Sequence, residues 1–268
     1  MTFDSIIFDI DGILIDTDRS FSRAVVDSVA YVSGEERFTL DEISRLKQMP
    51  GFNNDWNVAV AGACWLRFHP KLSFETFARR VEQQGGGLQG VRKLCPDFTP
   101  PYQQRITRLA QEAYGGESRC QYLYGFEPKW FRISGHWQTE KPKVEPGVLQ
   151  GLDSKIGIVT GRSLAELNLA FEILDWRIPD GFVAWSDDPE LDKPNPSKLI
   201  NVIRNMETSH PVLLGDSRDD LELVRNYRAT TQKPMAFCLI GKEDALEGCD
   251  LRFGKTREFL DFWENQNG

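Results

Sequence analysis

The sequence predicts an α/β protein in which a doubly wound parallel sheet carries an inserted, mainly α-helical domain. Four short apolar runs are typical of strands that are buried on both faces, as in a parallel sheet. They cover residues 6–8, 156–159, 212–214 and 236–240. Amphipathic stretches at 164–174, 196–206 and 219–228 alternate with the later runs. Strand–helix alternation with short links is typical of a doubly wound sheet.

The segment between the first two strands has a different pattern, with helical periodicity and hardly any strand signal. Helices are expected at about 19–33, 39–48, 55–68, 74–84 and 101–114. Thr39 and Glu42 have the spacing of a capping box, and Pro101 suits a first helical turn. We therefore expect residues 1–16 and 144–268 to form an α/β domain and residues 17–143 to form a helical domain inserted into it.

Composition and charge argue against several classes of protein. The 268 residues carry a net charge of −8 and no long basic run, which argues against a nucleic-acid or anionic-membrane surface. No apolar stretch reaches membrane-spanning length and no signal peptide is recognisable, so we expect a cytoplasmic protein. The five cysteines are odd in number and contain no CxxC pair, and the three histidines lack ligand spacing. We expect free thiols and no zinc site.

The first motif is Asp9-Ile10-Asp11-Gly12, directly after the first apolar run. Two carboxylates two residues apart at the end of a buried strand can converge on one metal ion, and Gly12 allows a sharp turn. A calcium loop would need oxygen ligands at its fifth and twelfth positions, where Ile13 and Ser20 stand. A surface turn is the other simple interpretation of this motif alone.

The second motif, Thr160-Gly161-Arg162, follows the second apolar run. Ser163 and Glu166 have capping-box spacing, so Thr160 is expected where a strand passes into a helix N-terminus. A hydroxyl and free backbone N–H groups at that point can bind a phosphate group.

The third motif is Asp192-Lys193-Pro194-Asn195-Pro196. Asn195 followed by Pro196 is typical of an N-cap and a first helical residue, which would hold Lys193 at the start of a helix. A lysine beside prolines is also common as an ordinary solvated side chain.

The fourth motif, Gly215-Asp216-Ser217-Arg218-Asp219-Asp220, ends one strand and begins a helix. The helix dipole favours acidic residues in a first turn, which accounts for Asp219 and Asp220 but not for Asp216. Three carboxylates within five residues repel one another unless a cation or hydrogen bonds compensate them.

All four motifs fall at the carboxyl ends of predicted parallel strands, where open α/β sheets place their sites. Together they supply carboxylates for Mg²⁺, a hydroxyl group and a lysine. This set of groups is suited to phosphoryl transfer.

The four motifs, in this order, resemble those of the haloacid dehalogenase superfamily. The resemblance covers residues 1–16 and about 144–268, and it implies a Rossmann-like core of that family. The helical insert resembles a C1-type cap, and segment 51–56 together with Val159-Thr160-Gly161-Arg162 resembles a phosphatase-like subgroup of subfamily I. Ile13 and Arg162 depart from the usual family pattern, and we expect Arg162 to contact the substrate.

The resemblance implies a Mg²⁺-dependent phosphatase that acts on a small phosphorylated metabolite through an aspartyl-phosphate. In that mechanism Asp9 is the nucleophile and Asp11 is the general acid and base. Thr160, Gly161 and Lys193 would bind the phosphoryl group. Mg²⁺ would be held by Asp9, the backbone carbonyl of Asp11, and Asp216, with Asp220 or Asp219 in support.

Other functions are compatible with parts of this set of motifs. A phosphomutase of the β-phosphoglucomutase type shares all four motifs and remains the main alternative. Haloacid dehalogenases lack an acid at the position of Asp11, and a non-catalytic binding protein would be expected to have lost part of the acidic set. Residues 85–90 fit the pattern GxGxxG but follow a charged helix rather than a strand, so we interpret them as a flexible loop of the cap rather than a dinucleotide site.

Substrate specificity is expected to come from the cap. Segment 50–56 joins two predicted helices and concentrates Asn53, Asn54 and Trp56, which we assign to substrate binding. The simpler alternative is that Asn54 or Asp55 caps the next helix and that Trp56 belongs to the cap core. The sequence does not indicate an oligomeric state.

Overall fold

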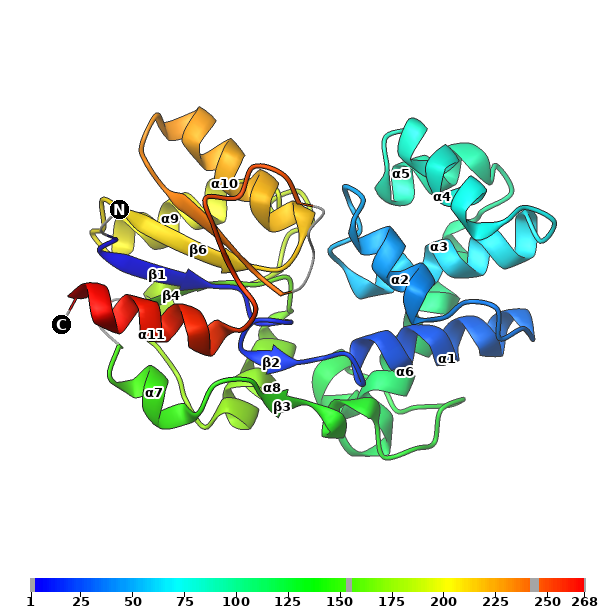
Figure 1. Ribbon diagram of the computed structural model, residues 1–268. Coiled ribbons are helices and arrows are strands. Elements are labelled where there is room, and N and C mark those ends of the chain that lie inside the picture. The colour runs from blue at the N-terminus through cyan, green and yellow to red at the C-terminus, as the bar shows by residue number, and fades with distance from the viewer. Residues whose placement is uncertain (1–2, 153–155, 242–245, 268) are drawn as a thin grey trace. The chain divides into compact units, whose positions relative to one another are not determined.

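The computed structural model describes residues 3–152, 156–241 and 246–267. The chain divides into two compact units (Figure 1). The core unit comprises residues 1–16 and 141–268, and the helical unit comprises Thr17–Glu140. Each unit has its own hydrophobic core.

The core unit is built on a six-stranded sheet in the order β5-β4-β1-β6-β7-β8, in which every pair of neighbours is parallel. Its strands are β1 (Ser5–Phe8), β4 (Ile156–Val159), β5 (Val183–Ala184), β6 (Pro211–Gly215), β7 (Ala236–Ile240) and β8 (Leu251–Phe253). The predicted fold class and the four predicted strands are confirmed. The sequence analysis did not predict β5 and β8, which have only two and three residues.

Helices cover both faces of this sheet (Figure 1). Alternate residues of β1 point to opposite faces, so Ile6 and Phe8 belong to one buried cluster and Ile7 to another. One face packs against α7 (Pro146–Gln150), α8 (Leu164–Leu174) and α11 (Thr256–Asn267). The other face packs against α9 (Ser197–Asn205) and α10 (Arg218–Thr231). A short η3 turn (Asp180–Phe182) precedes β5.

Strand β1 lies between β4 and β6, so the chain moves from β1 to one side of the sheet and later returns to the other. The carboxyl ends of β1, β4 and β6 are therefore adjacent at a point where the strand order reverses. Open α/β sheets bind ligands at such points.

A two-stranded antiparallel ribbon of β2 (Ile15–Asp16) and β3 (Lys141–Pro142) lies at the two places where the chain passes between the units. Because β3 pairs with β2, Lys141–Pro142 belong to the core unit. Strands of two residues carry no readable hydrophobic periodicity, which explains why the sequence analysis did not predict this ribbon.

The helical unit contains six α-helices and one 3₁₀ turn among its residues, all of which are described. They are α1 (Phe21–Ser33), α2 (Leu40–Lys47), α3 (Asp55–Phe68), α4 (Phe74–Gln83), α5 (Gly87–Leu94), α6 (Pro100–Tyr124) and η1 (His136–Thr139). The capping box of Thr39 and Glu42 is confirmed, and α6 begins with the predicted proline turn. Helices α1, α3 and α6 pack against one another, and apolar side chains of these helices form one buried cluster with those of α2, α4 and α5.

One sequence expectation about this unit was wrong. Residues 87–90 begin helix α5 and are not part of a flexible loop, because Val91 and its neighbours bury an apolar face that the glycine-rich composition concealed. The helix expected at about 101–114 corresponds to the first part of α6: Gly116 has non-helical dihedral angles and interrupts the helix, and a further helical segment follows it as far as Tyr124.

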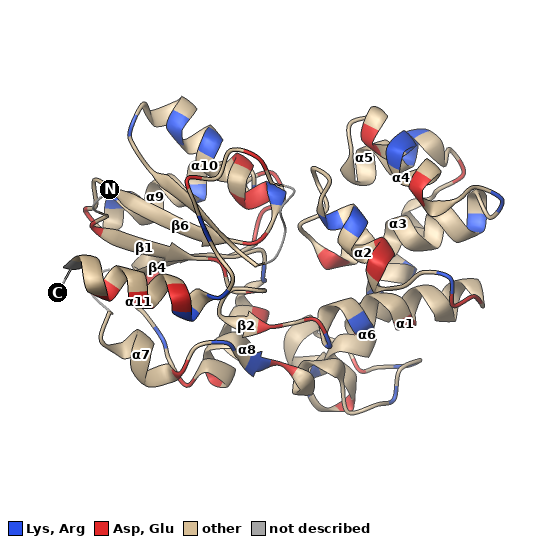
Figure 2. Ribbon diagram, in the orientation of Figure 1, with Lys and Arg blue, Asp and Glu red and all other residues tan. Residues whose placement is uncertain are grey.

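The remaining features agree with the composition. All five cysteines are free, and four of them are buried. Acidic and basic side chains are dispersed over the helices of both units (Figure 2). Within the described ranges, no helix has the length and apolar character needed to cross a bilayer.

A pair of glycine substitutions tests how the start of segment 50–56 is held. Gly86 and Gly34 both have a φ of 72°, but ψ is −175° at Gly86 and 15° at Gly34. A Cβ on Gly86 would lie 2.5 Å from the carbonyl oxygen of Pro50, whereas one on Gly34 would meet nothing within 4 Å. We expect Gly34→Ala to lower the free energy of unfolding by about 1 kcal/mol from backbone strain alone. Gly86→Ala should lower it by a further ~1–3 kcal/mol, because its backbone conformation is almost restricted to glycine and because the neighbouring loop must move. Thermal unfolding followed by circular dichroism would contradict this close approach if both variants shifted equally.

Candidate active site

Asp9 stands at the end of β1, where its backbone N–H donates to the carbonyl of Leu214 on β6. The residue is 5 % exposed. Its Oδ1 accepts hydrogen bonds from the backbone N–H of Ile10 at 2.8 Å and from Lys193 Nζ at 3.0 Å. Among the described residues, Oδ2 has no hydrogen-bond donor. The side chain is thus held through one oxygen, and the other keeps its lone pairs for a ligand or for attack.

Lys193 lies in the loop between β5 and α9, and its side chain is 2 % exposed. Besides Asp9, its Nζ donates to Asp220 Oδ1 at 2.7 Å. The third and fourth motifs therefore meet the first at this one ammonium group. An ordinary solvated lysine, the simpler interpretation of the third motif, does not describe this buried side chain.

Lys198, on α9, anchors the loop that carries Lys193. Its Nζ donates to the carbonyl of Trp185 at 2.7 Å and contacts Asp187 at 2.7 Å and Asp192 at 3.0 Å. The predicted N-cap is nearly correct: Asn195 accepts from the backbone N–H of Ser197, but the helix begins at Ser197, one residue later than expected. Sequence reasoning missed Lys198, and only its spacing of five residues from Lys193 could have suggested it.

Asp220 has two roles in the first turn of α10. Its Oδ2 accepts from the hydroxyl of Ser217 at 2.6 Å and from its backbone N–H at 3.2 Å, and this completes a capping box. Its Oδ1 accepts from Lys193. Both carboxylate oxygens are therefore engaged, and the side chain is fully buried.

Asp216 follows β6 and lies against the turn at Gly12. A Cβ on Gly12, whose φ is 74°, would lie 1.9 Å from Asp216 Oδ2, so only glycine leaves room for this carboxylate. The Nζ of Lys143 donates to the carbonyl of Gly12 and supports the same turn, a contact that the sequence analysis did not anticipate.

Asp9, Asp216 and Asp220 form a carboxylate cluster, each offering one oxygen, with these oxygens within 4.8 Å of one another. This donor set suits a hard divalent cation such as Mg²⁺, which binds oxygen ligands and uses few carboxylates. Lys193 and Ser217 already engage both oxygens of Asp220, which suits Asp220 to support the cluster rather than to bind the ion directly. Asp219, the alternative named from sequence, is buried.

Burial first, and then the charges of neighbouring groups, shift the pKa values of Asp9 and Lys193. Burial raises the pKa of Asp9 to about 7; the charges of Asp220 and Asp11 add to the rise, and that of Lys193 opposes it. Burial alone would lower the pKa of Lys193, but Asp220 and Asp9 raise it above its ordinary value. Lys193 is thus a permanent cation here, and it does not by itself compensate the carboxylates around it.

Thr160 and Gly161 lie at the carboxyl end of β4. The backbone N–H of Thr160 donates to the carbonyl of Ala184, and its buried Oγ1 accepts from the backbone N–H of Arg162 at 3.2 Å. Ser163 and Glu166 form the predicted capping box at the start of α8. The strand-to-helix turn predicted from the second motif is therefore confirmed.

Asp11 and Arg162 form an ion pair that joins the first and second motifs. Arg162 Nε and Nη2 lie 2.9 and 2.7 Å from Asp11 Oδ1. The arginine side chain is 1 % exposed, whereas that of Asp11 is 26 % exposed. The structure thus places the guanidinium against Asp11, while contact with a substrate remains a prediction.

The candidate specificity residues belong to the helical unit. Asn54 is the N-cap of α3 and accepts from the backbone N–H of Trp56 at 2.9 Å. The ring of Trp56 packs against those of Phe21, Tyr114 and Tyr124. These contacts match the simpler alternative drawn from the sequence, and substrate binding by Asn53, Asn54 and Trp56 remains a prediction.

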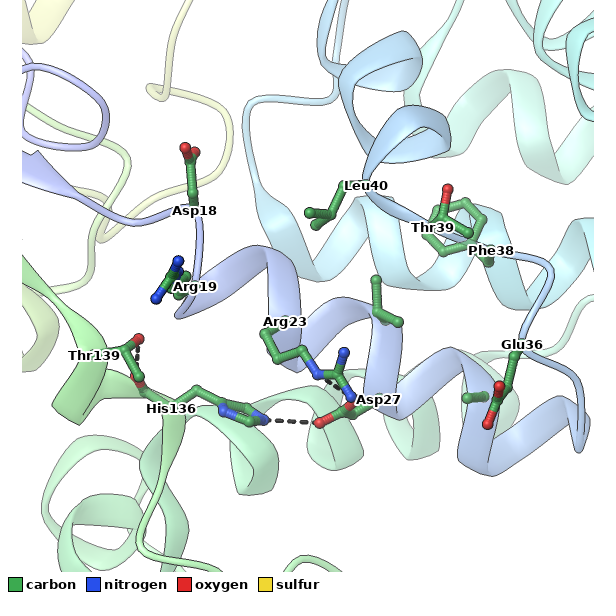
Figure 3. A pocket seen from close by; sticks show the side chains of 12 residues that line it. Asp18, Arg19, Arg23, Asp27, Glu36, Phe38, Thr39, Leu40, His136 and Thr139 are labelled. Carbon is green, nitrogen blue, oxygen red and sulfur yellow. Dashed lines mark hydrogen bonds and ion pairs between the residues drawn. The ribbon is translucent and has the colours of Figure 1, made fainter.

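The helical unit also contains a cavity of about 600 Å³ (Figure 3). Asp27 on its wall pairs with Arg23 Nε at 2.9 Å and with His136 Nε2 at 2.8 Å. Apolar side chains, including Phe38 and Leu40, line another part of it. None of the site residues predicted from sequence lines this cavity.

Comparison with known proteins adds to this picture. No family model and no curated protein sequence matches the chain. Among solved structures, a phosphatase from Thermococcus thioreducens, Tt82, is similar over 98 % of this chain and 99 % of its own, with 24 % identity and a TM-score of 0.67.

Two further solved structures are similar over almost their whole lengths. A HAD-superfamily hydrolase of subfamily IA from Geobacter sulfurreducens shares 16 % identity with a TM-score of 0.50, covering 97 % of this chain and 96 % of its own. CbbY from Rhodobacter sphaeroides, solved in complex with phosphate, shares 18 % identity over 96 % of each chain, with a TM-score of 0.54. The chain therefore shares its fold with these proteins, one of which is named a phosphatase and another a HAD-superfamily hydrolase.

Proposed function

We propose that this protein is a Mg²⁺-dependent phosphatase that hydrolyses a small organic phosphate monoester through an aspartyl-phosphate on Asp9. The observation that carries the proposal is the buried meeting of Asp9, Lys193 and Asp220, beside Asp216, at the carboxyl edge of a parallel sheet. Carboxylates that serve as nucleophiles form covalent intermediates of this kind.

Asp9 has the geometry of a nucleophile. Lys193 and the backbone of Ile10 hold its Oδ1, so Oδ2 is the oxygen that would attack phosphorus. Lys193 and Thr160 would bind the phosphoryl oxygens, where positioning and charge stabilisation provide most of the rate enhancement. Asp11, two residues further along, would protonate the leaving oxygen and later deprotonate water.

The cation would be held by Asp9 and Asp216, with the backbone carbonyl of Asp11 as a further ligand and Asp220 in support through Lys193. When bound, it would neutralise charge on the phosphoryl oxygens and lower the repulsion between them and Asp9.

Hydrolysis to a free alcohol is favoured over the alternatives. The Thermococcus protein similar to this chain is named a phosphatase, and Asp11 supplies the acid that a dehalogenase would lack. The core motifs would contact only the phosphate group and the metal ion, which all phosphate esters can provide. We propose that the substrate is a small phosphorylated metabolite.

The first test is the dependence of turnover on Asp9 and on Mg²⁺. Asp9→Asn should reduce hydrolysis of p-nitrophenyl phosphate by at least about 10³-fold, because it removes the attacking carboxylate and a metal ligand together. EDTA should silence the wild type, and Mg²⁺ should restore it. Unimpaired hydrolysis by folded Asp9→Asn, or full activity after exhaustive chelation, would contradict the proposal.

A second test measures stability without any substrate. The pKa of Asp9 is raised from 3.8 to about 7 on folding, so protonation of Asp9 favours the folded state. This contribution is complete below about pH 4 and is lost as the pH rises through about 7. In EDTA, we expect the Tm of the wild type to fall more steeply over this range than that of Asp9→Asn. Mg²⁺ should reduce this difference. Parallel plots of Tm against pH for the two proteins in EDTA would show that burial does not raise the pKa of Asp9.

A third test separates the two interpretations of Asn54. Asn54→Asp keeps the oxygen that caps α3 but removes the amide N–H, whereas Asn54→Ala removes both. If Asn54 binds substrate, Asn54→Asp should keep the Tm and lower kcat/KM by roughly 10- to 100-fold for the best ester in a screen of phosphorylated metabolites. Asn53→Ala should behave in the same way. Full activity of Asn54→Asp, with a lower Tm for Asn54→Ala, would assign Asn54 to capping only.

A further inference from the structure

The ion pair between Arg162 and Asp11 has an unusual geometry. An arginine that meets a carboxylate side-on usually donates one N–H to each oxygen. Here Nε and Nη2 both lie within hydrogen-bond distance of the same atom, Oδ1 of Asp11, at 2.9 and 2.7 Å. The two oxygens of this carboxylate are therefore not equivalent.

The guanidinium is fixed on its own side. Arg162 is 1 % exposed, its Nη1 donates to the carbonyl of Glu166 at 3.3 Å, and its backbone N–H donates to Thr160. Its place relative to Asp11 is set by the sheet, because the strands that precede them, β1 and β4, are paired through Phe8 and Ile158. Arg162 is thus a rigid support for Asp11, with its guanidinium turned toward that carboxylate.

The other oxygen of Asp11 is left available. Oδ2 has no hydrogen-bond partner within residues 3–152, 156–241 and 246–267, and the side chain is 26 % exposed. With Oδ1 engaged by two N–H donors of Arg162, Oδ2 is the oxygen of Asp11 that can meet a ligand.

We propose that Arg162 is a positioning residue that fixes Oδ1 of Asp11 and so makes Oδ2 the atom that transfers protons in the reaction. The inference rests on the proposed phosphatase function. As Asp9 Oδ2 bonds to phosphorus, the phosphorus–oxygen bond to the leaving group breaks, and the proton on Asp11 Oδ2 moves to the leaving oxygen to form an alcohol. In the second half, Asp11 Oδ2 takes a proton from water, the hydroxide bonds to phosphorus, and Asp9 leaves as a carboxylate with release of phosphate.

This role differs from contact between Arg162 and the substrate. A substrate ligand would direct its N–H groups at the substrate, whereas each of the three nitrogens of the Arg162 guanidinium donates to a protein atom, which engages three of its five N–H groups. A ligand would also aid all esters alike, whereas a residue that positions the proton donor matters most when the leaving group needs a proton.

The test compares kcat/KM for phenyl phosphate, a poor leaving group, with that for p-nitrophenyl phosphate, whose leaving group needs little protonation. The variants are Arg162→Met, Arg162→Lys, Asp11→Asn and the double variant Asp11→Asn/Arg162→Met. Because kcat/KM reports the steps up to the first irreversible one, hydrolysis of the intermediate does not obscure the result. The Tm of each variant is measured beside its activity.

We expect Arg162→Met to lower kcat/KM for phenyl phosphate by roughly 10- to 100-fold and for p-nitrophenyl phosphate by less than about 3-fold. Arg162→Lys should recover part of the loss, since an ammonium can still hold Oδ1. In the Asp11→Asn background, Arg162→Met should have almost no further effect, because the two residues act as a unit.

Equal losses on both esters, or losses that multiply in the double variant, would overturn the inference and assign Arg162 to substrate binding or to folding. If Arg162→Met is too unstable to assay, Arg162→Lys is compared with the wild type on the two esters. A larger loss of kcat/KM for phenyl phosphate than for p-nitrophenyl phosphate would support the inference, and equal losses would overturn it. These outcomes are distinct from failure of the proposed function, in which Asp9→Asn would remain active or the wild type would hydrolyse neither ester.

Discussion

The arrangement of the site depends on one buried ammonium group. Lys193 lies between Asp9, at the end of β1, and Asp220, in the first turn of α10. Burying two carboxylates without a partner would cost several kcal/mol, so the loop that carries Lys193 must be held firmly. Lys198 holds this loop by contacting the carbonyl oxygen of Trp185 and the carboxylates of Asp187 and Asp192. These three residues belong to the same loop and precede Lys193 in the chain.

Three carboxylates of the site, those of Asp9, Asp11 and Asp220, use their two oxygens in different ways. Asp9 uses Oδ1 for support and leaves Oδ2 open, and Asp11 does the same against Arg162. Asp220 uses both oxygens for support, one on Lys193 and one on the helix N-terminus. The open oxygens are thus those of the residues proposed to react, and the closed ones belong to the residue proposed to stabilise the site.

Much of this could be predicted from the sequence, because strands buried on both faces and capping boxes leave local patterns. The strand ends with Asp9, Thr160 and Asp216, and the caps at Ser163 and Ser217, were all of this kind. The pairing of Arg162 with Asp11 could not be predicted, since it joins residues 151 positions apart and depends on β1 and β4 being neighbours. The helix at 87–94 was missed because its glycines weaken helical propensity while its burial comes from tertiary packing.

The central claim is that Asp9 carries the phosphoryl group during turnover, and trapping that intermediate tests it most directly. Acid quenching during hydrolysis of p-nitrophenyl phosphate, followed by mass spectrometry of the peptides, locates any phosphorylated residue. The account predicts a phosphorylated Asp9 peptide that accumulates in Asp11→Asn, where hydrolysis of the intermediate lacks its base, and that is missing in Asp9→Asn. Continued turnover with the Asp9 peptide unmodified in both the wild type and Asp11→Asn would contradict it.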